Sequence, residues 1–423
     1  MSEMSFMERL FSGIEIKWKP LKKVAEIRSG WGFPNIYQGQ SEGIYPFYKV
    51  SDMNSAGNET VMVSANNYVD DVVVKKLGIK LAPAGSVIFP KIGAAVATNK
   101  KRLLSVPSAY DNNVMGLIPG EEISPRFLFF WMQTINLSSL AHDSGAVPSI
   151  RKSEMEVLPI PVPPLQIQAE IIRVLDTFTA LTAELTAELT AELTARKKQY
   201  NYYRDQLLGF EEGDVEWKAL GEIGEFIRGK RFTKADYVED GIGAIHYGEI
   251  YTRYGVFTTH VISQIRNDMA KSLRYAEPGD VVITDVGETV EDVGKAVAWL
   301  GDEKVAIHDH CYAFRHSMNP KFVSYCMQTA SFIAEKAKYV ARTKVNTLLI
   351  NGFAKIAIPV PYPNDLEKSL AEQARIVAIL DKFDTLTNSI SEGLPREIAL
   401  RQKQYEYYRD LLLSFPKPEE VVA

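Results

Sequence analysis

The strongest constraint on the fold is an internal repeat whose period is about half the chain. The sequence Trp-Lys-Pro-Leu at 18–21 recurs as Trp-Lys-Ala-Leu at 217–220. A longer match joins 196–210 to 401–415, and both blocks contain Gln-Tyr-x-Tyr-Tyr-Arg-Asp-x-Leu-Leu. Self-similarity over such a period indicates a duplicated structural unit. We therefore predict two related halves.

The matched blocks alternate with segments that diverge. Gly30 and Gly229 keep the same distance from the repeated Trp, but most other positions between the blocks differ. Constant segments suggest one kind of partner contacted twice, and variable segments on a shared frame suggest two different ligands. The predicted segments are an N-terminal segment 1–17, a first variable domain 18–157, a central helical segment 158–213, a second variable domain 214–357 and a C-terminal helical segment 358–423.

The constant segments have the pattern of long helices. Ile171, Phe178 and Leu185 are seven residues apart, interleaved with Val174 and Leu181, which is the spacing of a coiled-coil seam. The second copy repeats the seam with Ile376, Phe383 and Ile390, interleaved with Ile379 and Leu386.

The ends of these helices are also predicted. Prolines 159–164 cannot continue a helix, so the first one should run from about 165 to 210, roughly 70 Å at ~1.5 Å per residue. Gly393 and Pro395 predict a kink in the second helix that the first lacks.

The sequence Thr-Ala-Glu-Leu occurs three times in a row, over 182–193. A four-residue repeat exceeds the ~3.6-residue turn, so its leucine stripe winds slowly around the helix. The distances from Asp176 to Arg196 and from Asp381 to Arg401 are both 20 positions, which suggests two spacers of matched length. A low-complexity solubilising linker is the alternative, disfavoured because the repeat lies inside a periodic helix. The candidate spacer and partner-binding residues are Phe178, Leu181, Leu185, Leu189, Leu193, Tyr200, Tyr203, Phe383, Leu386, Tyr405 and Tyr408.

The variable segments mix strand and helix patterns. Apolar runs at 72–74, 86–89 and 281–284 predict strands, and runs at 127–134 and 322–337, each opened by a proline, predict helices. The predicted fold class is α+β. It has two mixed α/β domains in a pseudo-twofold arrangement, joined by two long antiparallel helices that form a coiled coil.

Charge leaves nucleic-acid binding open. The chain has a net charge of −5, but the acidic excess lies outside the variable domains, where basic and acidic residues number 15 and 12 in 18–157 and 18 and 17 in 217–357. Arg and Lys suit phosphates and guanine, and Asn suits adenine. Each candidate alone is more often ordinary solvated surface, but as sets they favour DNA. The candidates are Lys49, Lys91, Lys100, Lys101, Arg102, Asn112, Asn113, Arg151, Lys152, Arg228, Lys230, Arg231, His246, Tyr247, Arg253, Arg342, Lys344 and Asn346.

Catalytic and metal-binding patterns are incomplete. Residues 224–231 approach a phosphate-binding loop, but Arg231 stands where Ser or Thr must supply a hydroxyl. His308-Asp309-His310-Cys311 resembles a metal cluster, yet the corresponding stretch Tyr110-Asp111-Asn112-Asn113 lacks such ligands. A polar strand end is the favoured interpretation there. We predict no metal site and no catalytic residue.

The expected compartment is the cytoplasm. Cys311 and Cys326, the only cysteines, form no close pair, as in proteins of reducing compartments. Residues 1–17 lack the apolar core of a signal peptide, and no stretch reaches the ~18 apolar residues of a membrane helix. We expect no membrane partner.

Taken together, the repeats resemble the specificity subunits of type I restriction-modification enzymes, and among them the type IC branch. The resemblance rests on Pro-Val-Pro-Pro-Leu at 161–165, the two Gln-Tyr-x-Tyr-Tyr-Arg-Asp blocks and the Thr-Ala-Glu-Leu units. It implies a non-catalytic subunit that binds double-stranded DNA, with each variable domain reading one half of a split, asymmetric site. The helical spacer would set the unread gap.

The resemblance also implies partners. The helices would dock two methyltransferase subunits, which use S-adenosylmethionine to methylate a flipped adenine at N6. A restriction motor-nuclease subunit would use ATP and magnesium, and this chain itself would hold no cofactor. Two alternatives remain open: a self-contained DNA-modifying enzyme, disfavoured by the missing motifs, and a coiled-coil scaffold for proteins only, disfavoured by the two diverged domains.

Overall fold

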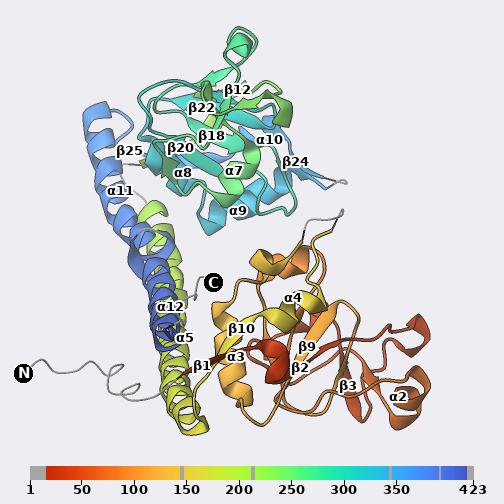
Figure 1. Ribbon diagram of the computed structural model, residues 1–423. Helices are drawn as coiled ribbons and strands as arrows, with labels where there is room; N and C mark the ends of the chain where they lie inside the picture. Colours follow the sequence, from red (N-terminus) through yellow and green to blue (C-terminus); the bar gives the residue numbers. More distant parts are fainter. Residues whose placement is uncertain (1–15, 143–146, 211–214, 343–344, 390–391, 417–423) are drawn as a thin grey trace, which may run out of the picture. The chain divides into compact units, whose positions relative to one another are not determined.

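The computed structural model describes residues 16–142, 147–210, 215–342, 345–389 and 392–416 (Figure 1). The chain forms two compact units, Met1–Leu185 with Leu400–Ala423, and Thr186–Ala399. Each unit therefore combines one variable domain with parts of the long helices. The segment boundaries predicted from the repeat stay predictions.

The first unit is built on a five-stranded sheet, to which a three-stranded sheet is added. Helix α3 (Pro125–Thr134) packs on strands β6 and β9 and fills the core with Phe127 and Phe130. The sheet order is β2 (Ala25–Ser29), β9 (Val114–Pro119), β6 (Val87–Pro90), β7 (Arg102–Leu104) and β4 (Val61–Met62), beside β5 (Tyr68–Val69), β3 (Tyr45–Tyr48) and β8 (Ala109–Tyr110).

The second unit repeats this plan. Its main sheet has the order β12 (Gly224–Arg228), β22 (Cys311–His316), β18 (Val281–Thr284), β20 (Ala296–Trp299) and β15 (Phe257–Thr258). In both main sheets only the last pair, β7–β4 or β20–β15, is parallel. The shared topology confirms the predicted duplication.

Further small sheets complete the second unit. One has the order β13 (Tyr237–Val238), β16 (Ser263–Ile265), β14 (Ile242–Ile245), β21 (Val305–Ile307) and β17 (Tyr275–Ala276), and another has β19 (Val286–Gly287), β24 (Asn346–Leu348) and β23 (Val340–Ala341).

The repeated Trp and Ile-Pro-Val-Pro blocks pair with each other inside each unit. Strand β1 (Lys17–Pro20) is antiparallel to β10 (Pro159–Val162), and β11 (Val215–Ala219) is antiparallel to β25 (Ala357–Pro361). These two-stranded ribbons bring the start and the end of each variable domain together.

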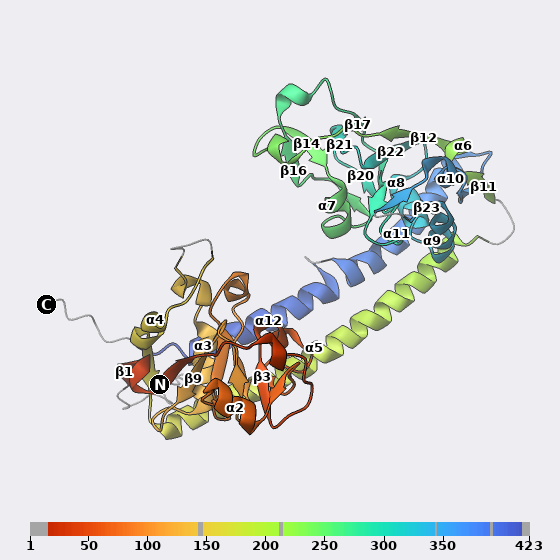
Figure 2. The same ribbon diagram turned by 90° about the vertical axis from the view of Figure 1, so that its right-hand side faces the viewer.

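The long helices are α5 (Leu165–Leu208), α11 (Leu366–Asn388) and α12 (Gly393–Leu412). Helix α12 lies antiparallel to the first part of α5 in the first unit, and α11 lies beside the second part of α5 in the second unit (Figure 2). The bounds of α5 and the interruption before Gly393 confirm two expectations. Gly393 has φ +73°, and a Cβ there would come within 3.0 Å of the Thr385 carbonyl oxygen, so another residue would be strained.

The buried stripe of these helices differs from a pure heptad seam. Ile171 and Leu175 are fully buried, as are Ile376 and Leu380, whereas Leu181 is 56% exposed. Each helix packs against its own domain as well as against another helix, so the buried face follows both neighbours. The coiled coil and the pseudo-twofold arrangement stay predictions, and Ile390 lies outside the described residues.

Two local predictions were wrong. Val72–Val74 belong to helix α2 (Asp71–Leu77), because the Asp70 carboxylate accepts a hydrogen bond from Val73 N and Gly78 ends the helix in the left-handed conformation. The helix predicted over 322–337 is divided into α8 (Pro320–Cys326) and α9 (Ala330–Lys336), since Thr329 caps a new start. Across the described residues, no helix is long and apolar enough for a membrane span.

Candidate nucleic-acid interface

In the first unit a polar turn, Asp111–Asn113, connects β8 to β9; we call it the first polar turn. The backbone that holds it comes from two other segments. Trp31 N donates to Tyr110 O at 2.9 Å, Gly30 N to Val114 O at 3.1 Å, and Asp111 N to Tyr48 O at 2.9 Å. These bonds fix the turn at the end of the main sheet.

The second unit has an equivalent turn, His308–His310, between β21 and β22; we call it the second polar turn. Here Lys230 N donates to Ile307 O at 3.0 Å, Gly229 N to Cys311 O at 2.9 Å, and His308 N to Ile245 O at 3.2 Å. The same three backbone bonds therefore hold both turns, although the side chains differ.

These bonds correct the register expected from sequence. Asp111 corresponds to His308, Asn112 to Asp309 and Asn113 to His310, one position away from the match of Tyr110 with His308. The two helix caps beside the turns agree with this register, since Lys49 N donates to the Asp52 carboxylate at 2.6 Å and His246 N donates to the Glu249 carboxylate at 3.0 Å. Lys49 and His246 thus occupy equivalent places.

Gly30 and Gly229 allow the close backbone approach at each turn. A Cβ at Gly30 would lie within 3.0 Å of the carbonyl oxygens of Tyr110 and Asp111, and one at Gly229 would clash equally with those of Ile307 and His308. This explains why glycine stands at both positions although neighbouring residues differ.

The first polar turn has one buried anchor and two outward side chains. Asp111 is buried and accepts hydrogen bonds from Asn113 N at 3.0 Å and Nδ2 at 3.2 Å, and burial raises its pKa. Asn112 and Asn113 are exposed. Amides, each with a donor and an acceptor, are therefore presented to solvent.

The backbone places basic residues next to the first polar turn. Lys91 N donates to Asn113 O at 2.9 Å, and Ile150 N, next to Arg151, donates to Lys91 O at 2.8 Å. Burial lowers the pKa of Lys91, whose Nζ donates to Ser29 Oγ at 3.1 Å. The fold thus brings together five of the candidates: Lys49, Lys91, Asn112, Asn113 and Arg151. The sequence indicated this grouping only in part. Lys152 is exposed in α4 (Lys152–Val157), 3.8 Å from Glu156.

The second polar turn is organised by Asp285. Its carboxylate lies 3.1 Å from both His310 Nδ1 and an Arg228 nitrogen, and burial raises its pKa. The Tyr247 ring is 5.4 Å from the rings of both His308 and His310. Arg228, His246 and Tyr247 are therefore brought to the turn, and Lys230 is bonded to it through its backbone.

His308 is the buried anchor of the second polar turn. Its Nε2 lies 3.1 Å from Phe232 O, and its Nδ1 accepts a hydrogen bond from His310 N at 3.2 Å. Asp309 Oδ1 also lies 3.0 Å from this Nδ1. Burial lowers the pKa of His308 to about 4.

The second unit should lose stability on acidification. Burial lowers the pKa of both His308 and His316 to about 4, whereas an unfolded histidine titrates near 6.5. As the pH falls below about 6.5, the two histidines bind protons in the unfolded chain but not in the folded chain. The free energy of unfolding therefore decreases until about pH 4. Between pH 7 and 5.5 we expect a loss of up to about 3 kcal/mol for the pair.

Hydrogen exchange of β22 amides, corrected for intrinsic rates, would measure this loss. The His308→Gln/His316→Gln variant should show a clearly smaller change with pH, whereas His260→Gln, an exposed control, should behave as the parent does. Equal acid sensitivity in parent and double variant would refute the assignment.

Other candidates lie apart from the turns. Lys101 was expected at a DNA surface but is completely buried, with Nζ donating to Ile135 O at 2.6 Å and Asn99 Oδ1 at 2.8 Å. Burial lowers its pKa to about 7. The sequence does not reveal which residue of the basic run 100–102 points inward. Because Lys101 is buried, it is not a DNA contact. Lys100 and Arg102 bind Asn54 and Met53.

In the second unit Arg231 is exposed beside Lys230, and Arg253 is exposed at the end of α7 (Tyr247–Thr252). Asn346 in β24 donates through Nδ2 to Glu288 O at 2.8 Å, and Leu348 N of that strand donates to Asp285 O at 2.7 Å. Arg342 is exposed, and Lys344 lies outside the described residues.

Sequence reasoning missed the anchors Asp111, His308 and Asp285 and did not count His310 as a DNA contact. In the sequence, two signals pointed to these places: the equal spacing of Gly30 and Gly229, and the matched polar stretches 110–113 and 308–311. Over the described residues, no group of three or more His, Cys, Asp or Glu side chains has metal-binding geometry.

The helix candidates form equivalent aromatic contacts in the two units. In the first, Phe178 and Tyr408 have ring centroids 5.9 Å apart, and the Thr179 and Tyr405 hydroxyls are hydrogen-bonded at 3.0 Å. In the second, Tyr203 and Phe383 stack at 5.6 Å. The remaining helix candidates are Tyr200, which is buried, and Leu185, Leu189, Leu193 and Leu386, which are half-buried.

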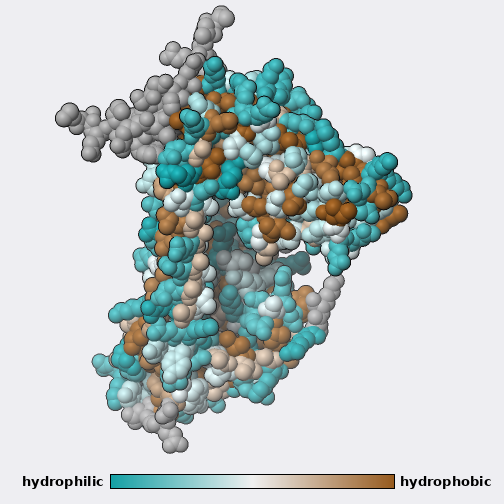
Figure 3. Space-filling view, turned by 90° about the horizontal axis from the view of Figure 1, so that it is seen from below, coloured by the Kyte–Doolittle hydropathy of each residue, from teal (hydrophilic) through white to brown (hydrophobic). Residues whose placement is uncertain are grey.

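Each unit also exposes a tyrosine pair, which we call the twin tyrosine pairs. Tyr202 and Tyr203 have centroids 5.4 Å apart at 73°, and Tyr407 and Tyr408 repeat this at 5.4 Å and 72°. Tyr202 is 61% and Tyr407 64% exposed. On the face drawn in Figure 3, hydrophobic residues lie in several groups among hydrophilic residues.

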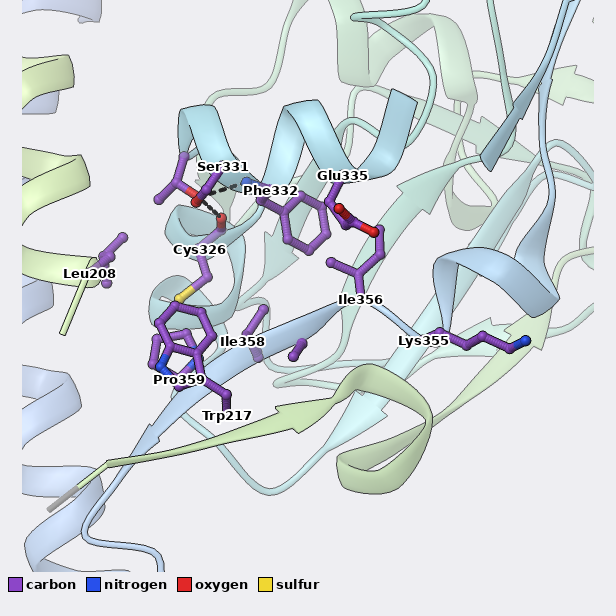
Figure 4. A pocket seen from close by; sticks show the side chains of 12 residues that line it. Leu208, Trp217, Cys326, Ser331, Phe332, Glu335, Lys355, Ile356, Ile358 and Pro359 are labelled. Carbon is purple, nitrogen blue, oxygen red and sulfur yellow. Dashed lines mark hydrogen bonds between the residues drawn. The ribbon is translucent and has the colours of Figure 1, made fainter. Parts of the chain in front are cut away.

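A separate pocket of about 390 Å³ lies in the second unit. Figure 4 shows Leu208 of α5 facing it, with Trp217, Cys326 and Phe332 on its walls and Lys355 at one side. Trp217 is 49% exposed. The pocket lies among the repeated blocks, away from the residues of the second polar turn.

The duplicated sheets, the equivalent polar turns with different side chains and the twin tyrosine pairs define a class: an internally duplicated protein whose two units present different polar surfaces on one backbone frame. Residues 14–195 and 212–400 match the family described as the type I restriction modification DNA specificity domain. The chain belongs to this family.

Known proteins agree with this assignment. The chain is 33% identical over 434 residues to the type I restriction enzyme EcoR124I/EcoR124II specificity subunit of Escherichia coli, covering 100% of both chains. It is 31% identical to a putative type I restriction enzyme specificity subunit of Haemophilus influenzae, covering 97% of this chain and 98% of that one.

A solved chain from a study of complex assembly and conformational transition of the type I R-M system shares the fold. It has a TM-score of 0.62 and 16% identity, with coverage of 94% of this chain and 97% of that one. The mixed α/β fold class predicted from the sequence is thereby confirmed.

Proposed function

We propose that the chain is the non-catalytic specificity subunit of a type I restriction-modification complex and recognises a two-part, asymmetric sequence in double-stranded DNA. The observation that carries this is the pair of polar turns, which share one backbone frame but present amides in one unit and an imidazole and a carboxylate in the other. Two different surfaces on one frame suit two different half-sites.

The continuous helix α5 supports a role in spacing. Its 44 residues run from one unit into the other, and the Thr-Ala-Glu-Leu units lie in its middle. We infer that the length of α5 sets the number of unread base pairs between the half-sites, as in the type IC branch that the repeats resemble.

The partners follow from the same duplication. We infer that two methyltransferase subunits dock on the helices, one at each of the twin tyrosine pairs, and that restriction motor-nuclease subunits join this complex. The partners would use S-adenosylmethionine, ATP and magnesium, and this chain would recognise the DNA sequence. The complex would act in the cytoplasm.

A direct test uses the purified complex with its methyltransferase partner. Duplexes that carry both half-sites at the native gap should be methylated at adenine N6, and duplexes with either half-site scrambled should not. Methylation by this chain without the partner would favour a self-contained enzyme. Failure of the assembled complex to bind any duplex would favour a protein scaffold.

The twin tyrosine pairs should control stoichiometry. Because aromatic residues at the centre of interfaces often contribute most of the binding energy, Tyr202→Ala or Tyr407→Ala should weaken one of two equivalent sites by at least about tenfold. Native mass spectrometry of the complex, at concentrations near the dissociation constant, should then show one methyltransferase subunit in place of two. Glu188→Ala, exposed on the same helix as Tyr202, is the control. Two subunits retained by both tyrosine variants would contradict this docking.

A further inference from the structure

We propose that the outward residues of the polar turns are specificity-determining: Asn112 and Asn113 read an A·T base pair in one half-site, and Asp309 and His310 read a G·C base pair in the other. This inference rests on the proposed function, since it assigns the reading of each half-site to named side chains.

In each turn one residue anchors the backbone and the next two are more exposed. Asp111 and His308 are 8% and 6% exposed and hold the turn by hydrogen bonds, so their chemistry is used in folding. The next two positions are more exposed: the side chain of Asp309 is 31% and that of His310 41% exposed, although Asp309 Oδ1 itself is buried, 3.0 Å from His308 Nδ1. Those two positions differ between the units, while the backbone bonds are the same.

The more exposed residues of the two turns match the edges of different base pairs. In the major groove adenine presents a donor beside an acceptor, which the amide of Asn matches with its own acceptor and donor. Guanine presents two acceptors and cytosine a donor, which an imidazole N–H and a carboxylate match. Asn112 and Asn113 therefore suit A·T, and His310 with Asp309 suits G·C.

Positively charged residues lie beside both turns. Lys49 and Lys91 lie beside the first polar turn, and Arg228 and Lys230 lie beside the second. Cations around a turn suit phosphate contacts, which orient a protein on the duplex without reading its sequence. With these cations on the DNA phosphates, each turn would face the groove between the two DNA backbones.

The experiment exchanges the outward residues between the turns in the complete complex. The methylated motif would be determined from a plasmid library for Asn112→Asp/Asn113→His and for Asp309→Asn/His310→Asn. We expect the first variant to change one base pair in one half of the motif and the second to change a base pair in the other half only. Lys271→Ala, exposed in the second unit and outside the candidate contacts, should keep the parental motif.

A milder variant guards against misfolding. Asn112→Ala, at an exposed position, should keep the parental melting temperature and lose about tenfold in discrimination at one A·T pair. If the parent yields a two-part motif and all turn variants methylate that same motif with unchanged preference, the turns do not determine specificity. If the parent itself yields no motif, the proposed function fails first.

Discussion

Deleting one Thr-Ala-Glu-Leu unit, residues 186–189, is expected to abolish methylation at the original sites and create methylation at sites with a shorter gap. Four helical residues span ~6 Å and turn by ~400°, which is ~40° beyond a full turn. A base pair adds ~3.4 Å of rise and about 35° of twist. The rise removed corresponds to nearly two base pairs and the excess rotation to about one, so the gap should shorten by one or two.

The control for this deletion keeps the length of α5. Glu188→Gln changes the same unit without removing a residue, and should leave both half-sites and their gap as they are. Sequencing of methylated adenines would compare the motifs. An unchanged gap after the deletion, in a complex that still methylates, would show that α5 does not set the spacing.

The second large effect concerns the glycines of the polar turns. Gly30→Ala should destabilise the first unit, and Gly229→Ala the second, by at least ~3 kcal/mol, because the added methyl group would overlap two backbone carbonyl oxygens in each case. Neither oxygen can move without disturbing the turn that it belongs to. Each variant should therefore lose the reading of one half-site as well as stability.

Matched controls exist in the same two units. A Cβ at Gly32 or Gly255 would meet no atom within 4 Å, so Gly32→Ala and Gly255→Ala should unfold as the parent does. Thermal unfolding with hydrogen exchange would localise the loss to one unit. Parental stability of both Gly30→Ala and Gly229→Ala would show that the close approach at the turns is not real.

The helices and the duplication were predictable because they depend on local patterns. Prolines before Leu165 and the Ala-, Glu- and Leu-rich repeat define α5, and Gly393 explains the interruption before α12. The strands β6 and β18 also follow from their β-branched residues. Val72–Val74 failed as a strand because the Asp70 cap and packing outweighed their strand propensity.

The candidate site was less predictable, for two physical reasons. Charge patterns do not distinguish a side chain that faces solvent from one that points inward, as the buried Lys101 shows. The polar turns are equivalent through backbone hydrogen bonds, while their side chains share no chemistry, so side-chain similarity placed them one residue out of register. The paired glycines, which the backbone geometry requires, marked the turns in the sequence in the correct register.

The most direct test of the account is a genome-wide map of N6-methyladenine in cells that express this chain with its methyltransferase partner, compared with cells that lack this gene alone. We expect a two-part, asymmetric motif with a fixed gap that is methylated only when the gene is present. Absence of any gene-dependent motif, with all subunits expressed and assembled, would contradict it and favour a protein scaffold.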